Sequence, residues 1–365
     1  MSSLGEDRCW VEINRTALLH NARLARARAG AGTSLAAVVK ANGYGHGMVE
    51  VARALRTEAQ LFGVANLAEA EGLRVGGISE PILLLGPALP NERRAISEAG
   101  FIASISSFAE AQAFAARPTA INFVLDTGMG RIGTWHEDAL AVLEKISKLP
   151  NVQLHSISTH LPVADEDPAY TEAQLEQFEQ VVRQIRARVP GGYKVHALLS
   201  AGVLGFGHHR FDMVRAGLML YGSSPLPSEQ KFLQPVMTMK ARIALLRDLP
   251  AGRSISYGRT FTTTRSTRVA TISAGYADGY PRQLSNRDAS VLVGGLRCPV
   301  LGRVTMDLTM IDVSHVSGVE LGDEVVLIGK QAGEEIFAAE VAERARTIAW
   351  EIFTGIGSRV RRVYW

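Results

Sequence analysis

The chain has 365 residues, of which 47% are hydrophobic and 21% charged, the composition of a folded globular protein rather than a disordered or fibrous one. The formal net charge of +3 is small for this length, so the charge balance favours neither nucleic acid nor an anionic membrane as a partner. No apolar run is long enough to span a membrane, and residues 1–8 lack the pattern of a secretory signal, so we expect a cytoplasmic protein.

Short apolar runs alternate with amphipathic segments over the first part of the chain. Helical patterns lie between most of the runs, as in 68–77 and 170–189. Eight strands alternating with helices predict a closed (β/α)8 TIM barrel, with an open doubly wound sheet as the second possibility. The predicted strands are 34–40, 61–65, 81–85, 101–105, 120–125, 153–159, 194–199 and 213–221.

The sequence pattern changes after the eight predicted barrel strands, and this change predicts a second domain. Residues 222–235 are rich in Gly, Ser and Pro, as linkers are. Beyond them, β-rich runs separated by turns predict a smaller, mostly antiparallel β domain with one short helix near 338–345. We therefore expect a barrel domain over 1–230 and a β domain over 231–365. Cys9 and Cys298 lack the spacing of a disulfide framework or a metal site, so no metal is expected.

The apolar run 34–39 ends on Lys40, and lysine is almost never buried without a partner. Such a lysine is either a solvated strand end or a residue with a chemical task. The segment after it, "ANGYGHG", contains glycines, which let the backbone approach a ligand closely. It also contains Tyr44 and His46, whose side chains end in polar groups. The turn therefore favours a chemical role for Lys40.

Polar side chains stand at four further strand ends. Asp126 to Arg131 ("DTGMGR") follow the fifth strand, His160 ends the sixth, Ser200 ends the seventh and Arg215 lies in the eighth. Each alone has a structural explanation, such as a core histidine or a tight turn. Because (β/α)8 barrels carry their chemistry at the carboxyl ends of the strands, the five ends together predict an active site.

The ends of the seventh and eighth strands are where barrels commonly bind phosphate. The segments 200–202 and 215–217 contain the small residues that suit such binding. A lysine facing a phosphorylated cofactor predicts pyridoxal 5'-phosphate, which attaches to its enzymes through a lysine amine.

Seven motifs, in order along the chain, resemble those of the bacterial alanine racemases. These are pyridoxal-phosphate enzymes with a (β/α)8 barrel followed by a β domain. The resemblance covers nearly the whole chain and implies an isomerase that interconverts L- and D-alanine, supplying D-alanine for peptidoglycan. The motifs are "AVVKANGYGHG", "DTGMGRIG", "STHLPVADE", "DMVRAGLMLYG", "SISYGRTF", "AGYADGYPR" and "LGRVTMDLTM".

The resemblance also implies roles for single residues. Lys40 would hold the cofactor covalently and act as one of two bases, and Tyr257 would be the second base, provided by the partner subunit of a homodimer. Arg215 would face the pyridine nitrogen, and Arg131 would bind the substrate carboxylate. The remaining residues fall into two groups. Those implied to contact the cofactor are Tyr44, His160, Ser200, Gly217, Leu218 and Trp350. Those implied to contact the substrate or line its entry channel are Met306, Tyr276 and Arg282.

Racemisation itself requires two bases, because a proton leaves one face of Cα and another arrives on the opposite face. A tyrosine hydroxyl is a weak acid, so Tyr257 needs cationic or donor groups nearby. We expect His160, hydrogen-bonded towards Arg215 or His196, to provide them.

Three positions depart from the family pattern. Val124 stands where members commonly carry a carbamylated lysine that steadies the carboxylate-binding arginine. Leu199 replaces an asparagine before the phosphate-contacting serine, and Trp350 replaces a tyrosine that reaches the phosphate. Residues two apart on a strand share a face, so Asn122, Asp126 or a bound anion is expected to take the place of the carbamate.

These departures leave two alternatives open. One is a racemase of serine or another small amino acid, which the changes at Leu199 and Trp350 favour. The other is a protein that holds pyridoxal phosphate without turnover, which the presence of Tyr257 and of a complete second domain disfavours. A barrel decarboxylase is weaker still, since its glycine-triplet phosphate loop and cysteine motif are not seen.

Overall fold

The computed structural model describes residues 7–365, which form two compact units. The barrel unit comprises residues 18–43 and 48–234, and the β unit comprises residues 7–17, 44–47 and 235–365. The segment expected to lack a secretory signal, residues 1–8, lies mostly outside the described residues. Over residues 7–365, no helix combines the length and apolar composition that crossing a membrane requires.

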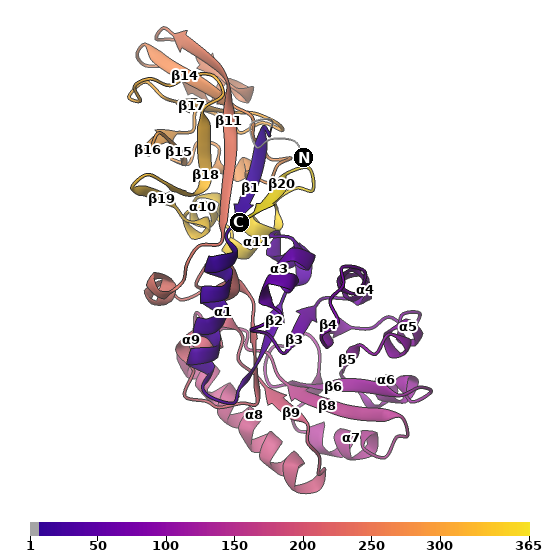
Figure 1. Cartoon of the computed structure of the whole chain (residues 1–365). Coiled ribbons are helices and arrows are strands. Elements are labelled where there is room, and N and C mark those ends of the chain that lie inside the picture. The colour runs from indigo at the N-terminus through magenta and orange to yellow at the C-terminus, as the bar shows by residue number, and fades with distance from the viewer. Residues whose placement is uncertain (1–6) are drawn as a thin grey trace. The chain divides into compact units, whose positions relative to one another are not determined.

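The barrel unit contains eight parallel strands in the order β10, β2, β3, β4, β5, β6, β8, β9 (Figure 1). The N–H of Arg215 in β10 donates to the carbonyl of Leu198, just after β9, at 2.9 Å, so the two edges meet and the barrel is nearly closed. The predicted barrel is confirmed, and the open sheet is not found. The strands are β2 (Ser34–Val38), β3 (Leu61–Val64), β4 (Ile82–Pro87), β5 (Ile102–Ile105), β6 (Thr119–Asp126), β8 (Val152–Ser158), β9 (Lys194–His196) and β10 (Met213–Ala216).

Helices connect these strands, and polar caps fix where several of them begin. The side chains of Asn66, Ser107 and Asp167 accept from backbone N–H groups three residues on, at 3.0–3.2 Å, as N-caps do. The helices are α1 (Arg15–Ala29), α2 (Lys40–Tyr44), α3 (Met48–Leu55), α4 (Leu67–Val75), α5 (Arg93–Glu98), α6 (Phe108–Phe114), α7 (Ala139–Ile146), α8 (Pro168–Arg188) and α9 (Ser200–Gly205), with 3-10 turns η2 (Leu218–Tyr221) and η3 (Pro227–Phe232) and a two-residue strand β7 (Thr134–Trp135).

The β unit is mostly antiparallel, in the order β16, β15, β18, β11, β1, β20, with β14 and β17 extending from β11. β1 and β20 pair in parallel, so the N- and C-terminal strands of the described chain are neighbours in one sheet (Figure 1). The elements are β1 (Cys9–Ile13), β11 (Met237–Leu249), β12 (Ser254–Ile255), η4 (Tyr257–Arg259), β13 (Phe261–Thr262), β14 (Thr267–Ile272), η5 (Arg282–Leu284), β15 (Ser290–Val293), β16 (Leu296–Pro299), β17 (Thr309–Asp312), β18 (Glu324–Gln331), β19 (Glu334–Ile336), α10 (Ala338–Ala345), α11 (Ala349–Thr354) and β20 (Arg361–Tyr364).

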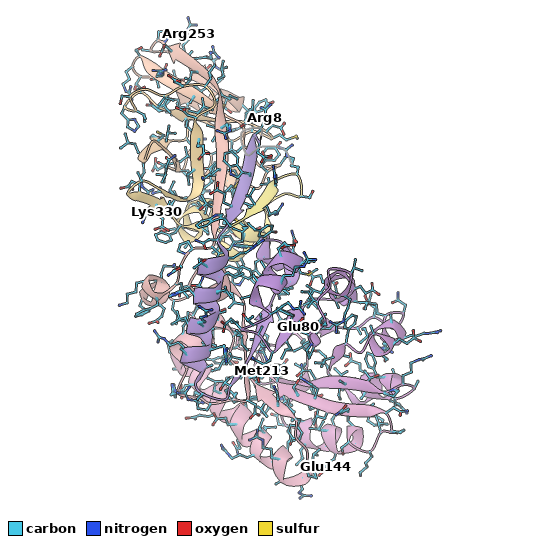
Figure 2. All side chains as sticks on the ribbon, viewed as in Figure 1. Arg8, Glu80, Glu144, Met213, Arg253 and Lys330 are labelled. Carbon is cyan, nitrogen blue, oxygen red and sulfur yellow. The ribbon has the colours of Figure 1, made fainter. Side chains whose placement is uncertain are left out.

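Burial along the strands explains why the two units differ. Four of the five residues of β2 and seven of the eight of β6 are buried, as expected for parallel strands covered on both faces. The first seven residues of β11 alternate between buried and partly exposed, as in a sheet with one covered face. Met213, labelled in Figure 2, is fully buried and packs with Ala36, Leu61, Leu83 and Ile102 in the barrel core.

Gly45, in the motif after Lys40, shows why this turn requires glycine. Its φ is +77°, and a Cβ there would lie 1.9 Å from the carbonyl oxygen of Phe353, within the β unit. We expect Gly45→Ala to lower the free energy of unfolding by about 2–4 kcal/mol, combining left-handed strain with overpacking. Gly32→Ala is the matched control, because its φ is +82° but nothing lies within 4 Å. If denaturant unfolding gave the same loss of unfolding free energy for Gly45→Ala and Gly32→Ala, the contact with Phe353 would contribute nothing.

Candidate active site

Lys40 stands two residues after β2, at the carboxyl end of the strand. Ala41 and Asn42 follow with left-handed backbone conformations, φ 52° and 54°, which non-glycine residues adopt only where the surroundings enforce them. Two side chains do so: Asn42 accepts from the N–H of Met48 at 3.0 Å, and Glu69 accepts from the N–H of Ala41 at 2.7 Å. Lys40 is therefore mounted on a rigid turn.

The surroundings of Lys40 favour its neutral amine. Burial lowers the pKa of Lys40, the positive charges of Arg131 and Arg215 lower it further, and only Glu69 opposes them. The neutral amine is the form that attacks a carbonyl carbon or removes a proton. The predicted chemical role of Lys40 thus agrees with its electrostatic environment.

Arg215 is a buried cation held by backbone oxygens. It is 6% exposed and donates to the carbonyls of Thr159 at 2.6 Å, Ala197 at 3.0 Å and His196 at 3.2 Å. It also donates to Nδ1 of His196. Burial and the charge of Arg131 lower the pKa of Arg215 to about 10, so it stays protonated at neutral pH. No carboxylate bonds to it among the described residues, and an uncompensated buried cation of this kind calls for an anionic or acceptor ligand.

The two histidines near Arg215 are both neutral. Burial, with the charges of Arg215, Arg131 and Lys40, lowers the pKa of His160 to about 3, and burial likewise places the pKa of His196 well below its ordinary value. The expected bond from His160 to Arg215 is wrong, because Arg215 bonds to His196 instead. Strand register is the reason: His196 pairs with Ser158, two residues before His160.

The ends of β9 and β10 form the predicted phosphate region. The hydroxyl oxygen of Ser200, at the start of α9, accepts from the N–H of Gly217 at 3.0 Å and of Met219 at 3.2 Å. Because the oxygen accepts both bonds, its own proton remains available to donate to a ligand. Leu218, which lies between Gly217 and Met219 in the sequence, is buried. Leu199 occupies the N-cap position of α9, and its side chain makes no capping hydrogen bond.

The "DTGMGR" turn is organised by a single carboxylate. Asp126, at the end of β6, accepts from the N–H groups of Gly128 at 2.9 Å, Met129 at 3.0 Å and Gly130 at 2.9 Å. These bonds fold the turn and present Arg131, which is exposed in this chain. Arg131 makes no ion pair with any residue between 7 and 365.

The side chains expected to replace the missing carbamate have other partners. Asn122 donates to the hydroxyls of Ser104 and Ser158, each at 3.0 Å, in a buried polar layer of the barrel, and Asp126 is committed to its turn. Val124 is 6% exposed and brings no charge. The expectation that Asn122 or Asp126 pairs with Arg131 is therefore wrong, and a bound anion is the candidate that remains.

Tyr257, Tyr276 and Met306 all belong to the β unit, apart from the barrel unit that carries Lys40. Their exposed fractions are 72%, 41% and 53%, high for large apolar side chains. Tyr257 begins η4, directly after Ser256, whose hydroxyl donates to the carbonyl of Arg303 at 2.6 Å. The N–H of Tyr276 donates to the carbonyl of Thr305 at 3.0 Å, which brings Tyr276 beside Met306.

Two further predicted cofactor contacts also belong to the β unit. Tyr44 is 7% exposed, and burial raises its pKa to about 12. Trp350 lies in α11, a helix that sequence analysis missed because it is only six residues long. Cys9 and Cys298 are free thiols, and burial raises the pKa of each to about 12, which keeps both in the unreactive thiol form.

Gln174 is a site-supporting residue that sequence analysis missed. It lies on the buried face of α8 and donates to the hydroxyl of Thr127 at 2.9 Å and to the carbonyl of His160 at 3.0 Å. The signal was a polar residue within the apolar stripe formed with Leu175 and Phe178.

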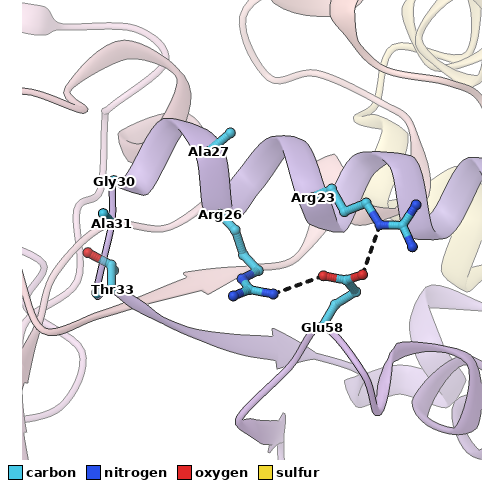
Figure 3. Close-up of a pocket in the computed structure, with 8 residues that line it drawn as sticks. Arg23, Arg26, Ala27, Gly30, Ala31, Thr33 and Glu58 are labelled. Carbon is cyan, nitrogen blue, oxygen red and sulfur yellow. Dashed lines mark hydrogen bonds and ion pairs between the residues drawn. The ribbon is translucent and has the colours of Figure 1, made fainter.

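An open pocket of about 310 Å³ lies at the opposite end of the strands (Figure 3). It is lined by the end of α1 and the start of β2, where Glu58 accepts from Arg23 at 2.8 Å and Arg26 at 3.0 Å. Glu58 thus forms an ion pair with each of the two arginines. Because barrel chemistry sits at the carboxyl ends of strands, this pocket is not the candidate site.

Comparisons with known proteins agree with this geometry. The family described as alanine racemase, N-terminal domain, matches residues 13–225, and alanine racemase, C-terminal domain, matches residues 236–364. The alanine racemase of Symbiobacterium thermophilum is 42% identical over 365 residues, 97% of this chain and 96% of that protein, and the one of Methylacidiphilum infernorum is 38% identical over 364 residues, 98% and 92% of the two chains. The crystal structure of alanine racemase from Bacillus anthracis with bound L-Ala-P has a TM-score of 0.90 and 34% identity, covering 98% of this chain and 95% of that one.

Proposed function

The chain belongs to the alanine racemase family, and we propose that it interconverts L- and D-alanine by a two-base mechanism that Lys40 and Tyr257 carry out. It is a pyridoxal-phosphate-dependent isomerase, as the family is. The observation that carries the proposal is the partly buried Lys40, which faces Arg131 and Arg215 with its neutral form favoured. The comparisons give no support to a serine racemase.

The residues at the strand ends fit pyridoxal phosphate. Arg215 and Arg131 bring positive charge to Lys40, Glu69 is the one carboxylate among the described residues that opposes it there, and an anionic phosphate and a substrate carboxylate would supply the missing charge. The Ser200 hydroxyl, together with Gly217, Leu218 and Tyr44, would hold the phosphate. His160 would lie against the ring, and Trp350 would border it.

Pyridoxal phosphate, when bound, supplies the electron sink that lets the α-proton of the amino acid leave. Arg215 would face the ring nitrogen as a donor that does not give up its proton, because a guanidinium remains charged. With Arg215 in this position, the ring would withdraw electrons less strongly, which would favour return of a proton to Cα over side reactions. Lys40 moves the proton on one face of Cα, and Tyr257 moves it on the other.

Substrate selection would fall to three residues. Arg131 would bind the carboxylate through its guanidinium, a fork that matches carboxylate geometry. The Met306 backbone would support it, and Tyr276 would line the entry channel. We further propose that the enzyme works in the cytoplasm and supplies D-alanine for peptidoglycan.

A panel of amino acids tests the proposed substrate. Purified holoenzyme is incubated with single L-amino acids in deuterated water, and α-proton exchange and the opposite enantiomer are measured. Both should appear with alanine. Turnover of serine at a rate equal to or above that of alanine would refute the assignment, and the absence of any turnover would favour a protein that only holds the cofactor.

We propose that the active form is a homodimer in which each site takes Tyr257 and Met306 from the partner chain. The exposure of Tyr257, Tyr276 and Met306 supports this, because an interface would cover them. Lys40→Ala and Tyr257→Phe chains should each be nearly inactive alone. After subunit exchange, about a quarter of wild-type activity should return, because half of the dimers are mixed and one site in each has both bases. No recovery despite proven exchange would place both bases in one chain.

We expect bicarbonate to have no effect on activity, because Val124 cannot be carbamylated. Arg131 has no carboxylate partner among residues 7–365, and a bound substrate would remove its exposed guanidinium from water, so a small anion such as chloride should steady it in place of the carbamate. Assays after exhaustive removal of bicarbonate should match untreated enzyme, whereas replacing chloride by a bulky anion should raise the KM for alanine. A requirement for bicarbonate would contradict this expectation.

A further inference from the structure

A cluster of two histidines and two carboxylates lies on the barrel unit, away from Lys40 and the phosphate region. Glu172 and Glu179 are on α8, and His208 and His209 are in the segment 206–212 that follows α9. We propose that this cluster, the "His208 cluster", binds one divalent metal ion of the zinc class. Sequence analysis expected no metal from the spacing of Cys9 and Cys298, and it missed this cluster because Glu172 and His208 are 36 residues apart and share no recognisable motif.

The ligand atoms are already close to a coordination geometry. Oε1 of Glu172 lies 3.1 Å from Nε2 of His208 and 2.8 Å from Nε2 of His209, and all three atoms lie within 4.8 Å of one another. Nitrogen and oxygen ligands about 2.1 Å from a zinc ion are about 3.4 Å apart in a tetrahedral set. Small side-chain movements therefore suffice, and His208, with a 64% exposed side chain, is free to make the largest one.

The other ring nitrogen of His209 has the partner that metal-binding histidines require. Its Nδ1 lies 2.8 Å from Oε1 of Glu179, which is about two turns along α8 from Glu172. A proton held on Nδ1 by Glu179 leaves the Nε2 lone pair directed towards Glu172 and the ion. Such carboxylate–histidine pairs fix the tautomer and orientation of metal ligands.

The cluster is also held in place without an ion. The His209 side chain is 8% exposed, and its ring stacks on Phe211 at 6.4 Å with an interplanar angle of 7°. Phe211 in turn contacts Phe178 of α8 at 5.7 Å, and Asp212 pairs with Arg186 of the same helix at 2.9 Å. Because Phe211 and Asp212, directly after the two histidines, both hold the segment against α8, little ordering is required on binding.

The ligand set indicates which metal binds. Two imidazoles and one carboxylate suit zinc and its transition-metal neighbours, whereas calcium and magnesium prefer oxygen ligands. The exposed side of His208 leaves a fourth position for water. The ion would join α8 to the segment 206–212 that follows α9, and would thereby stabilise this part of the barrel unit.

The test uses untagged, full-length holoenzyme stripped of metal by chelation, titrated with Zn²⁺ in a calorimeter and with Co²⁺ as a visible-absorption probe. Wild type should bind one ion per chain, with the cobalt bands of a four-coordinate site, and Zn²⁺ should raise its Tm. Glu172→Gln and His209→Gln should abolish binding. Glu179→Gln should weaken it about 10- to 100-fold, the usual effect of losing such a supporting carboxylate.

Glu176→Gln is the matched control, because Glu176 is exposed on the same helix and loses the same charge. It should bind as wild type does. His208→Gln covers the case in which the buried variants misfold, since an exposed side chain is not needed for folding. Wild-type binding no tighter than that of Glu172→Gln or His208→Gln, or an equal loss in Glu176→Gln, would mean adventitious surface binding only and would overturn the proposal.

Discussion

Replacing Lys40 by alanine is expected to abolish racemisation and the visible absorbance of bound pyridoxal phosphate together. Lys40 is the lysine at the carboxyl end of a barrel strand, on a turn held by Asn42 and Glu69, with its pKa lowered by burial and by Arg131 and Arg215. The substitution removes both the covalent attachment and one base. A lost general base alone costs about 10²–10⁴-fold in rate, and the loss of attachment adds to it.

Lys194→Ala is the matched control for this experiment. Lys194 begins β9, at the opposite end of a barrel strand, and its Nζ donates to the hydroxyl of Ser34 at 2.7 Å. We expect its removal to leave the absorbance and the turnover nearly unchanged. An unaltered visible spectrum in Lys40→Ala, or an equal effect of Lys194→Ala, would refute the assignment of Lys40.

The barrel could be predicted because its strands carry a strong local signal. Parallel strands covered on both faces are continuous apolar runs, and each of the eight predicted runs overlaps one of the observed strands. The β unit was predicted in outline from alternation, as in β11. The membership of β1 in that sheet was not, because its pairing with Ala241 and Arg361, among others, joins segments more than two hundred residues apart.

Of the candidate active site, only the residues that stand at the ends of barrel strands could be predicted from the sequence pattern. Lys40, His160, Ser200 and Arg215 follow from the rule that barrel strands present their chemistry at the carboxyl end. The partners of these residues do not follow from that rule. Arg215 reaches His196 on a neighbouring strand, which depends on the register between strands rather than on any local pattern.

The same limit explains the failed expectation for Arg131. Spacing along β6 correctly gives Asn122, Val124 and Asp126 one face, but it does not reveal which groups the neighbouring strands bring to that face. Ser104 and Ser158, on β5 and β8, take the Asn122 side chain instead. Hydrogen bonds to residues distant in the sequence therefore decide where the Asn122 side chain lies, and its spacing along β6 does not.

Tyr257→Phe is expected to lower racemisation by about 10²–10⁴-fold, the usual contribution of a general acid or base, with unequal effects on the two enantiomers. By the proposed roles, Tyr257 takes the α-proton from L-alanine and Lys40 takes it from D-alanine. Without the phenol, Lys40 can still remove the proton of D-alanine and return a solvent proton to the same face. Exchange of that proton into deuterated water should therefore survive better than conversion to L-alanine.

The measurement follows α-proton loss by NMR and enantiomer formation by chiral chromatography in the same reactions. Tyr257 is 72% exposed in its unit, so removal of one hydroxyl should leave the fold intact and isolate the chemical effect. Tyr193→Phe is the control: its hydroxyl donates to the carbonyl of Val189 at 3.1 Å, just before β9 begins and far from the carboxyl ends of the strands. Unchanged turnover is expected there. If Tyr257→Phe lost exchange and conversion of D-alanine to the same degree, the two-base assignment would be refuted, because proton removal from D-alanine would then depend on Tyr257 and not on Lys40 alone.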